Sequence, residues 1–171
     1  MSDIDSILGN KIPWKIVRFF IENPSIEVSQ TEMIEKLKIA KMSAVKWLNI
    51  LVESKFIVKK QIGRTNIYKL DRENSIVKQI KILFTMSVLL PKMPKIDGEI
   101  YLFGSSARGE DDEKSDIDIL VIGKDRSIIN KIQNANKKIK VIFFTQIDWS
   151  RISRDDAAFY ERVEKDRIRL V

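Results

Sequence analysis

The sequence predicts an α+β protein of two small domains, and three observations lead to this prediction. Residues 12–70 hold three segments with helical spacing of apolar residues, followed by two β-prone segments around a glycine. Residues 99–122 instead hold two β-prone segments joined through a glycine-serine turn and an acidic stretch. Charge divides in the same way: residues 1–95 contain 17 Lys and Arg against 9 Asp and Glu (+8), and residues 96–171 contain 14 against 15 (−1). A basic module beside a near-neutral one is typical of a protein of which one half meets a polyanion.

Composition excludes several kinds of site. The 171 residues include no Cys and no His, which excludes disulfides, thiolate metal sites and imidazole bases, so any metal must bind to oxygen atoms. The sequence contains no run of about 18 apolar residues, the length needed to span a bilayer, so we expect no membrane partner. Residues 1–10 contain two Asp and no positively charged stretch before an apolar core, unlike a secretory signal, so we expect a cytoplasmic protein.

Three helices are predicted in the basic half. The first spans residues 11–21, whose apolar side chains recur at helical spacing. The second begins after Ser29, because Ser29 and Glu32 have the spacing of a capping box. The third spans residues 41–53 and buries a stripe formed by Ala44, Val45, Leu48 and Leu51. Its basic and polar residues are expected outward or at the edges: Lys41, Ser43, Lys46, Trp47 and Asn49.

A hairpin follows the third helix. Residues 56–60 and 65–70 are β-prone and flank a turn that contains Gly63. Three short helices followed by a glycine-tipped hairpin resemble the winged-helix variant of helix-turn-helix proteins, and the resemblance covers residues 12–71. It implies that the third helix enters the major groove of double-stranded DNA while Arg64 on the wing reaches phosphate or the minor groove.

The DNA-binding residues implied by the resemblance are Lys41, Ser43, Lys46, Trp47, Asn49 and Arg64, of which Lys46 and Asn49 are types that bind base edges. Two alternatives stay open for this face. Its charges could merely solvate the surface, or the module could contact another protein. Trp47 has its own alternative, because a lone aromatic side chain on a helix commonly packs against a neighbour.

Residues 75–90 are predicted to form an apolar-rich helix that one small domain cannot bury completely. Its apolar surface could pair with a second copy, giving a homodimer, or pack onto the second domain. Pro91 and Pro94 end this helix. We therefore expect a DNA-binding domain at residues 1–73, a linking helix and linker at 74–95, and a second domain at 96–171.

The second domain contains a turn and a carboxylate pair. A β-prone segment ends in Gly104-Ser105, where glycine permits close backbone approach to a phosphate and Ser105 adds an amide and a hydroxyl at the start of a short helix. Gly109 is expected to close that helix. Asp116 and Asp118 are two apart in the next predicted strand, so their side chains share one face, and adjacent carboxylates favour a cation such as Mg²⁺.

Glycine-serine, ten intervening residues and then Asp-Ile-Asp-Ile resemble the signature of nucleotidyltransferases of the DNA polymerase β superfamily, above all its minimal prokaryotic members. The resemblance runs from residue 97 to 171 and implies an α/β domain with a mixed sheet. It assigns nucleoside triphosphate binding to Gly104, Ser105 and Arg108. It assigns catalysis and the binding of two Mg²⁺ ions to Asp116 and Asp118.

The resemblance also implies a third carboxylate on a neighbouring strand, and this sequence departs from it there. After a helix predicted at residues 127–138, the strand at 139–144 carries Lys140 at the expected position. A charged Lys could pair with Asp116 or Asp118 or contact phosphate, but it cannot ligate Mg²⁺ or accept a proton. A register shift, or a Lys140 that points to solvent, stays open. A helix at residues 155–164 and a strand at 167–171 are expected to cover the sheet.

Three functions follow from these features. The first is a DNA-binding, transcription-regulator-like protein whose nucleotidyltransferase domain has reduced catalysis. The second is an active Mg²⁺-dependent enzyme that transfers a nucleotide to a protein, RNA or small molecule. The third is an antitoxin-like or scaffold module for protein contacts. Whether the chain is an enzyme depends on Lys140.

Overall fold

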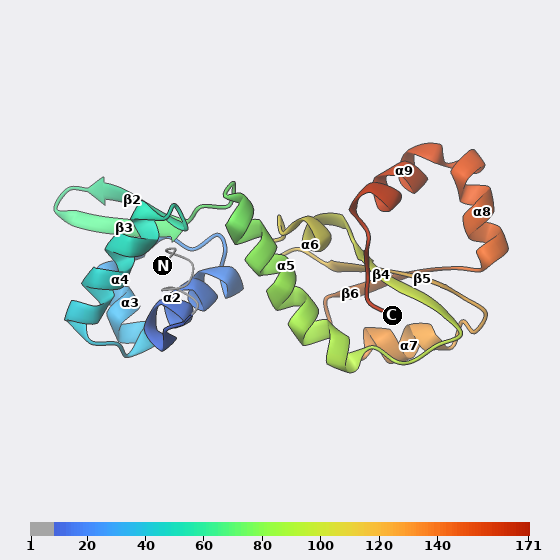
Figure 1. Ribbon diagram of the computed structural model, residues 1–171, viewed down its shortest axis with the longest axis horizontal. Helices are drawn as coiled ribbons and strands as arrows, with labels where there is room; N and C mark the ends of the chain where they lie inside the picture. The colour runs from blue at the N-terminus through green and yellow to red at the C-terminus, as the bar shows by residue number, and fades with distance from the viewer. Residues whose placement is uncertain (1–8) are drawn as a thin grey trace. The chain divides into compact units, whose positions relative to one another are not determined.

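The structure is a computed structural model that describes residues 9–171 (Figure 1). The chain divides into two compact units, with the boundary between Val77 and Lys78. The prediction about a secretory signal falls mainly on residues outside the described range. Within residues 9–171, no helix has the length and apolarity needed to cross a membrane.

The N-terminal unit combines three helices with a three-stranded antiparallel sheet of order β1-β3-β2. Its helices have the predicted positions, and the sheet gains a short strand that the sequence analysis did not predict, β1. The elements are α2 (Lys11–Glu22), β1 (Val28–Ser29), α3 (Gln30–Leu37), α4 (Lys41–Glu53), β2 (Ile57–Ile62) and β3 (Thr65–Leu70). The largest fully buried side chains come from every part of this unit: Ile16, Phe20, Met33, Leu48, Leu51, Phe56 and Tyr68. The hydrophobic spacing of each helix therefore points into one shared core.

The capping box before α3 is present as predicted. The Ser29 hydroxyl accepts from the Glu32 amide at 3.3 Å, and the Glu32 carboxylate accepts from the Ser29 amide at 2.8 Å. These hydrogen bonds with Ser29 lower the pKa of Glu32. Two donors at the start of the helix are thereby satisfied, which fixes where α3 begins.

Trp47 on α4 follows the alternative that a lone aromatic side chain packs against its neighbours. The sequence analysis expected it outward or at the edge of the helix, and its side chain is buried, with 8% of its surface exposed. The ammonium of Lys46 lies 5.1 Å from the centre of its ring. The helical spacing put Trp47 at the edge of the apolar stripe, and the large apolar ring is more stable inside that stripe than in water.

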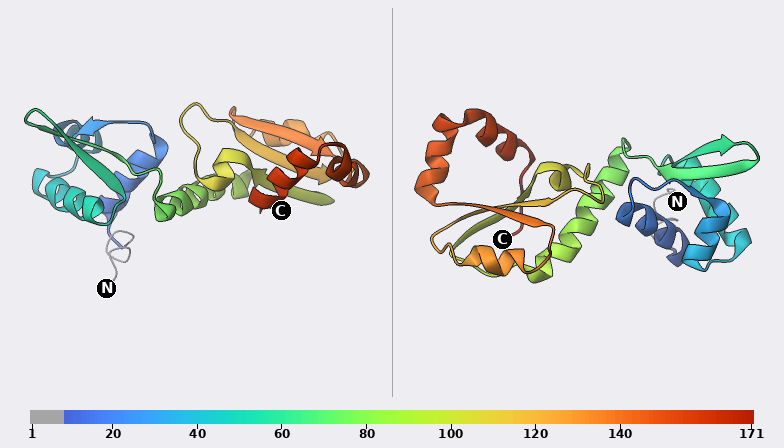
Figure 2. Two further views of the ribbon diagram at one scale, coloured as in Figure 1. Left: turned by 90° about the horizontal axis from the view of Figure 1, so that it is seen from above. Right: turned by 180° about the vertical axis from the view of Figure 1, so that it is seen from behind.

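The C-terminal unit is built on a four-stranded mixed sheet of order β6-β5-β4-β7 (Figures 1 and 2). The β5 and β6 strands are parallel, while β4 pairs antiparallel with β5 and with β7. The strands are β4 (Gly98–Phe103), β5 (Ile117–Gly123), β6 (Ile139–Phe144) and β7 (Ile168–Arg169). The helices are α5 (Ser75–Leu89), α6 (Gly104–Arg108), α7 (Ile128–Gln133), α8 (Gln146–Asp155) and α9 (Ala157–Asp166), with a single turn of 3₁₀ helix at Leu90–Lys92.

Helices cover both faces of this sheet, as Figure 2 shows. Alternate residues of β5 enter different cores: Ile119 packs in a cluster with residues of α5 and α7, and Leu120 packs in a cluster with residues of α8 and α9. A sheet covered on both faces explains why β5 is almost continuously apolar. Residues at even positions of β5 and β6 therefore face α8 and α9.

Helix α5 is the apolar-rich helix that the sequence predicts, and most of it belongs to the C-terminal unit. Leu89 is fully buried in the cluster that lies under the sheet, and Met86 packs against the same cluster. Leu83 stays 63% exposed. The helix thus buries part of its apolar surface within its own unit.

Two helices of this unit differ from the prediction. Helix α7 ends at Gln133 rather than near Lys138. The helix expected at residues 155–164 is present as α9, and α8 precedes it in a segment where the sequence analysis predicted no helix. Thr145 caps α8 by accepting from the Asp148 amide at 3.1 Å, and Asp156 caps α9 by accepting from the Phe159 amide at 3.0 Å. Capping residues at this spacing are the signal that marks both starts.

Candidate functional site

The glycine-serine turn lies directly at the end of β4, where Gly104 begins α6. Gly104 has φ +72°, a conformation that residues with a side chain rarely adopt. A Cβ at this position would lie 2.6 Å from Oδ2 of Asp118. Two features therefore require glycine at this position: the left-handed backbone conformation and the carboxylate that lies against Gly104. Gly109 closes α6 in the left-handed conformation, as predicted.

The two carboxylates lie beside this turn. Asp118 pairs with Phe103 across β4 and β5, so strand register brings it next to Gly104. Asp116 precedes β5, and its carbonyl accepts from the buried Ser106 hydroxyl at 3.4 Å. The pKa of Asp118 is raised, mainly by burial and then by the charge of Asp116, with Lys140 opposing the shift. The structure thus brings Gly104, Asp116 and Asp118 together.

Lys140 pairs with this carboxylate pair. It lies opposite Asp118 in the parallel register of β5 and β6, as the sequence predicts. Its Nζ is 2.6 Å from Oδ2 of Asp116, and that hydrogen bond raises the pKa of Lys140. Lys140 therefore has an ion-pair partner, while its side chain is at the same time 68% exposed. Lys140 is a charged donor at the position where the resemblance implies a carboxylate.

A third carboxylate is absent from this site among the described residues, which contain no group of three or more acidic side chains arranged to hold a metal. Asp148 follows the far end of β6, and its carboxylate accepts from the Thr145 hydroxyl at 2.7 Å. Because β6 runs parallel to β5, that end of the sheet is opposite to Asp116. Asp148 serves the start of α8.

The donor set fits one divalent cation. Asp116 and Asp118 supply carboxylate oxygens, the ligands that Mg²⁺ prefers, and the raised pKa of Asp118 shows that its charge is under-compensated. Mg²⁺ usually binds through one or two carboxylates, with waters and phosphate oxygens completing its coordination. The two-ion arrangement implied by the resemblance stays a prediction.

Arg108 lines the same site but is engaged elsewhere. Its Nη1 donates to Asp166 at 2.7 Å, and its Nε donates to Glu110 at 2.8 Å. These hydrogen bonds raise the pKa of Arg108. The guanidinium joins α6 to α9 and has two carboxylates to neutralise it, which disfavours the phosphate contact that the resemblance implies.

A pocket of about 420 Å³ opens at the turn. Its walls come from β4, α6, β5, β6 and α9, and its lining residues are Phe103, Gly104, Ser105, Arg108, Asp118, Ile142, Phe159 and Arg162. Pockets that hold small ligands commonly have such volumes. The sequence analysis missed Phe159 and Arg162, which it treated only as part of a covering helix.

The loop after α6 is not merely solvated. Lys81 on α5 is buried, with 2% of its side chain exposed, and its Nζ lies 3.1 Å from Oδ1 of Asp111. It also donates to the Asp111 carbonyl, so the approach to Oδ1 is an ion pair without good hydrogen-bond geometry. A Cβ on Gly109 would lie 2.3 Å from the Lys78 carbonyl. The loop that leads to Asp116 is thus held against α5.

The basic residues of the N-terminal unit divide by exposure. Lys41, Lys46 and Asn49 are exposed along α4, and Ser43 is half-buried. Arg64 is exposed beside Gly63 in the turn between β2 and β3. In β2 only Ile57 is buried, and the rest of the strand faces solvent. Apart from Trp47, the predicted DNA-binding residues are accessible.

Comparison with known proteins identifies the C-terminal unit. The family model of the nucleotidyltransferase domain matches residues 88–169, so the predicted nucleotidyltransferase domain is confirmed. A crystal structure of a candidate nucleotidyltransferase from Sulfolobus solfataricus aligns with a TM-score of 0.32 and 20% sequence identity, over 56% of this chain and 84% of that one. No curated protein gives a significant match.

Proposed function

We propose that the nucleotidyltransferase domain binds a nucleoside triphosphate and transfers the nucleotide slowly or not at all, because Lys140 replaces a carboxylate that the reaction needs. The 2.6 Å contact between Lys140 Nζ and Asp116 Oδ2 carries this proposal. The domain would then act as a nucleotide-responsive part of a DNA-binding regulator. The second hypothesis, an active transferase, is an outcome of the test.

Binding rests on the residues around the pocket. Gly104 would let the backbone approach the ligand closely, Ser105 offers a hydroxyl, and the Asp118 carboxylate lies against Gly104 in the same pocket. One Mg²⁺ held by Asp116 and Asp118 would neutralise phosphate charge. The pocket volume of about 420 Å³ is of the size that accepts part or all of a nucleotide.

Reduced transfer follows from the chemistry of Lys140. In-line attack on a phosphoryl group requires a deprotonated or well-aligned hydroxyl nucleophile. A carboxylate can accept that proton, whereas a charged ammonium has three donors and no acceptor. The hydrogen bond to Asp116 raises the pKa of Lys140, which keeps the ammonium charged at neutral pH. The same ammonium competes with a metal ion for Asp116.

The test combines binding with transfer. Wild-type protein is incubated with Mg²⁺ and each α-labelled ribonucleoside triphosphate, and titration calorimetry measures binding separately. We expect binding without appreciable transfer, and we expect Lys140→Asp to gain transfer that disappears in Lys140→Asp with Asp118→Ala. Lys137→Asp is the matched control, because it makes the same charge change at an exposed residue outside the pocket.

Each outcome has a definite meaning. Transfer by the wild-type protein that vanishes in Asp116→Ala/Asp118→Ala would show an active enzyme and overturn the role given to Lys140. Absence of nucleotide binding in the wild type would overturn the nucleotide-binding function and favour a scaffold for protein contacts. Equal gains in Lys140→Asp and Lys137→Asp would show that only net charge matters.

The N-terminal unit supports a second function, binding of double-stranded DNA as a winged-helix module. The N-terminal unit, residues 1–77, contains 13 Lys and Arg against 9 Asp and Glu, a net charge of +4, and Lys41, Lys46 and Asn49 are exposed along one helix. Arg64 is exposed at a hairpin turn, where a wing would contact phosphate. The buried Trp47 has no part in this proposed contact.

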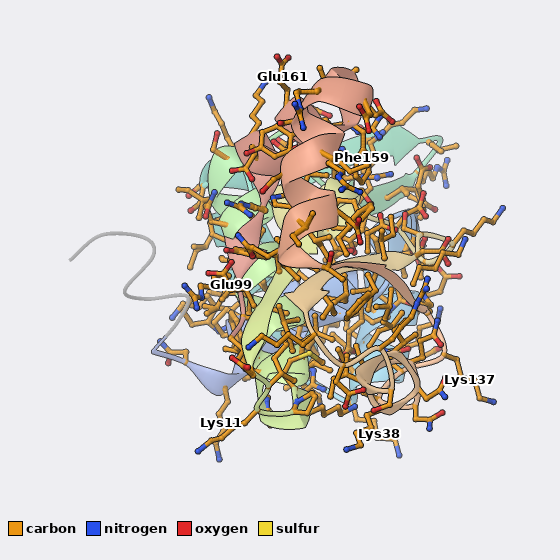
Figure 3. The ribbon with its side chains drawn as sticks, turned by 90° about the vertical axis from the view of Figure 1, so that its right-hand side faces the viewer. Lys11, Lys38, Glu99, Lys137, Phe159 and Glu161 are labelled. Atoms are coloured by element: carbon orange, nitrogen blue, oxygen red, sulfur yellow. The ribbon has the colours of Figure 1, made fainter. Side chains whose placement is uncertain are left out.

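Salt dependence tests the DNA contact. Affinity for random duplex DNA should fall steeply as salt rises, and Lys46→Ala should weaken it and lower the slope by about one. Lys11→Ala on α2, labelled in Figure 3, is the matched control and should leave the slope unchanged. Absence of DNA binding at low salt would overturn this function and leave the nucleotide-binding proposal intact.

A further inference from the structure

Helix α9 is fixed beside the glycine-serine turn at two points. The ring of Phe159 meets that of Phe103 edge-on, with ring centres 6.3 Å apart. About two turns further along α9, Asp166 accepts from Arg108 at 2.7 Å. Phe103 directly precedes α6 and Arg108 ends it, so the two contacts bracket the whole of α6. The segment of α9 between them must run alongside the turn.

Arg162 lies on that segment. It is three residues after Phe159 and four before Asp166, which places all three on one side of the helix. Arg162 lines the pocket together with Ser105 and Asp118. Figure 3 labels Phe159 and Glu161 on α9. Glu161 and Arg162 are both exposed, but only Arg162 is part of the pocket lining.

The charges around the pocket leave Arg162 as its available cation. Arg108 is neutralised by Glu110 and Asp166, and Lys140 by Asp116. Arg162 forms no ion pair within residues 9–171, and its guanidinium carbon lies 5.6 Å from the centre of the Phe159 ring. That contact orients the guanidinium without satisfying its charge or its donors.

We propose that Arg162 is a phosphate ligand of this pocket and binds the polyphosphate of a nucleotide together with Ser105. A guanidinium suits this role because its planar set of donors matches phosphate oxygens in pairs. The assignment rests on the proposed function, since it names a residue that holds the same ligand. It gives α9 a part in recognition in place of mere coverage of the sheet.

Titration calorimetry on the full chain tests this assignment with three probes: ATP with Mg²⁺, inorganic tripolyphosphate, and adenosine. Arg162→Gln should lower the affinity for ATP and tripolyphosphate at least about tenfold, the loss expected for a charge-assisted contact. Any affinity for adenosine should stay the same. Arg162→Lys should recover part of the loss, because it keeps the charge but not the paired donors.

The control is Arg154→Gln, which removes one exposed Arg charge from α8, outside the pocket lining. Thermal unfolding verifies that each variant is folded. Equal affinity of wild type and Arg162→Gln for both phosphate probes would overturn this assignment while leaving nucleotide binding intact. Wild-type protein that binds tripolyphosphate through Arg162 but not ATP would support the anion site and overturn the nucleotide proposal. If the wild type binds neither probe, both are overturned.

Discussion

The ammonium of Lys140 lies 2.6 Å from a carboxylate oxygen of Asp116, next to the loop between α6 and β5. Asp118 lies two residues further along the chain, in β5, and forms no such ion pair among residues 9–171. Burial, together with the charge of Asp116, raises its pKa. One carboxylate of the pair is therefore compensated by a side chain, and the other is left with a poorly stabilised charge. This difference has a measurable effect on stability.

Asp118→Asn should stabilise the protein near neutral pH. Because the folded-state pKa of Asp118 is raised, the folded state binds more protons than the unfolded state, and stability is lost as pH rises through the ionisation of this group. The free energy of unfolding of the wild type, relative to that of Asp118→Asn, should therefore fall as pH rises above about 4, the pKa of an unfolded Asp. Urea unfolding in metal-free buffer at several pH values measures this difference.

Asp125→Asn should change the pH dependence of stability in the opposite direction. Hydrogen bonds from the Ser127 hydroxyl and amide lower the pKa of Asp125, so its contribution is present above the unfolded pKa and is lost as pH falls. The two variants should show slopes of opposite direction against pH. Equal slopes would contradict the different environments of the two carboxylates.

Gly104→Ala should destabilise the C-terminal unit by at least about 2 kcal/mol, since the left-handed conformation alone costs about 1–2 kcal/mol for a residue with a Cβ. The added Cβ would also lie 2.6 Å from Asp118 Oδ2. Chemical denaturation measures the change. Gly63→Ala is the matched control, because it has φ +59° but no atom within 4 Å of the added Cβ.

A double-mutant cycle separates the two costs of Gly104→Ala. In an Asp118→Ala background the contact with Oδ2 is gone, so the remaining cost should approach that of Gly63→Ala, about 1 kcal/mol. An unchanged cost in that background would show that the carboxylate does not restrict the turn.

Asp111→Ala should destabilise the protein by about 2–3 kcal/mol, because it leaves the ammonium of Lys81 buried without its ion-pair partner. Lys81 is 2% exposed and Asp111 is 23% exposed, so little solvent can replace the lost carboxylate. Urea unfolding measures the change. Glu113→Ala, an exposed change in the same loop, should stay within about 0.5 kcal/mol. Similar losses in both variants would contradict a specific role for the buried pair.

The ion pair between Arg108 and Asp166 should show a coupling free energy of about 1 kcal/mol in a double-mutant cycle. The Asp166 side chain is 13% exposed, but that of Arg108 is 37% exposed, so solvent screening reduces the value expected for a buried pair. Thermal unfolding of the single and double alanine variants measures it. The Nζ of Lys124 lies 2.8 Å from Oδ2 of Asp97, a distance similar to that between Arg108 and Asp166. Both side chains of this second pair are highly exposed, so it should show no measurable coupling free energy.

The sequence predicted those features that depend on residues close together in the chain. Helical spacing and the capping box of Ser29 and Glu32 located the helices of the N-terminal unit, and glycine-serine followed by Asp-Ile-Asp located the centre of the site. Strand alternation then placed Lys140 correctly, because β5 and β6 are both almost continuously apolar and pair in parallel register.

The unpredicted features depend on residues far apart in the chain. The contact of Arg108 with Asp166 was not predicted, because the two residues are 58 apart in the chain. The ion pair of Asp111 was not predicted, because its partner, the buried Lys81, belongs to a helix far away in the sequence. Arg162 has no local motif, and its place in the pocket follows from how α9 packs along α6. Spacing within a segment cannot reveal such partners, since only the tertiary fold brings them together.

Lys140 acts as a counter-ion that is part of the chain, so unlike a bound metal ion it cannot be lost by dilution. The concentration of a tethered ammonium at Asp116 does not depend on the medium, so a chelator such as EDTA cannot remove it and a fall in cellular magnesium cannot empty it. Through Lys140, the protein therefore keeps part of the charge balance of Asp116 and Asp118 when no divalent cation is present.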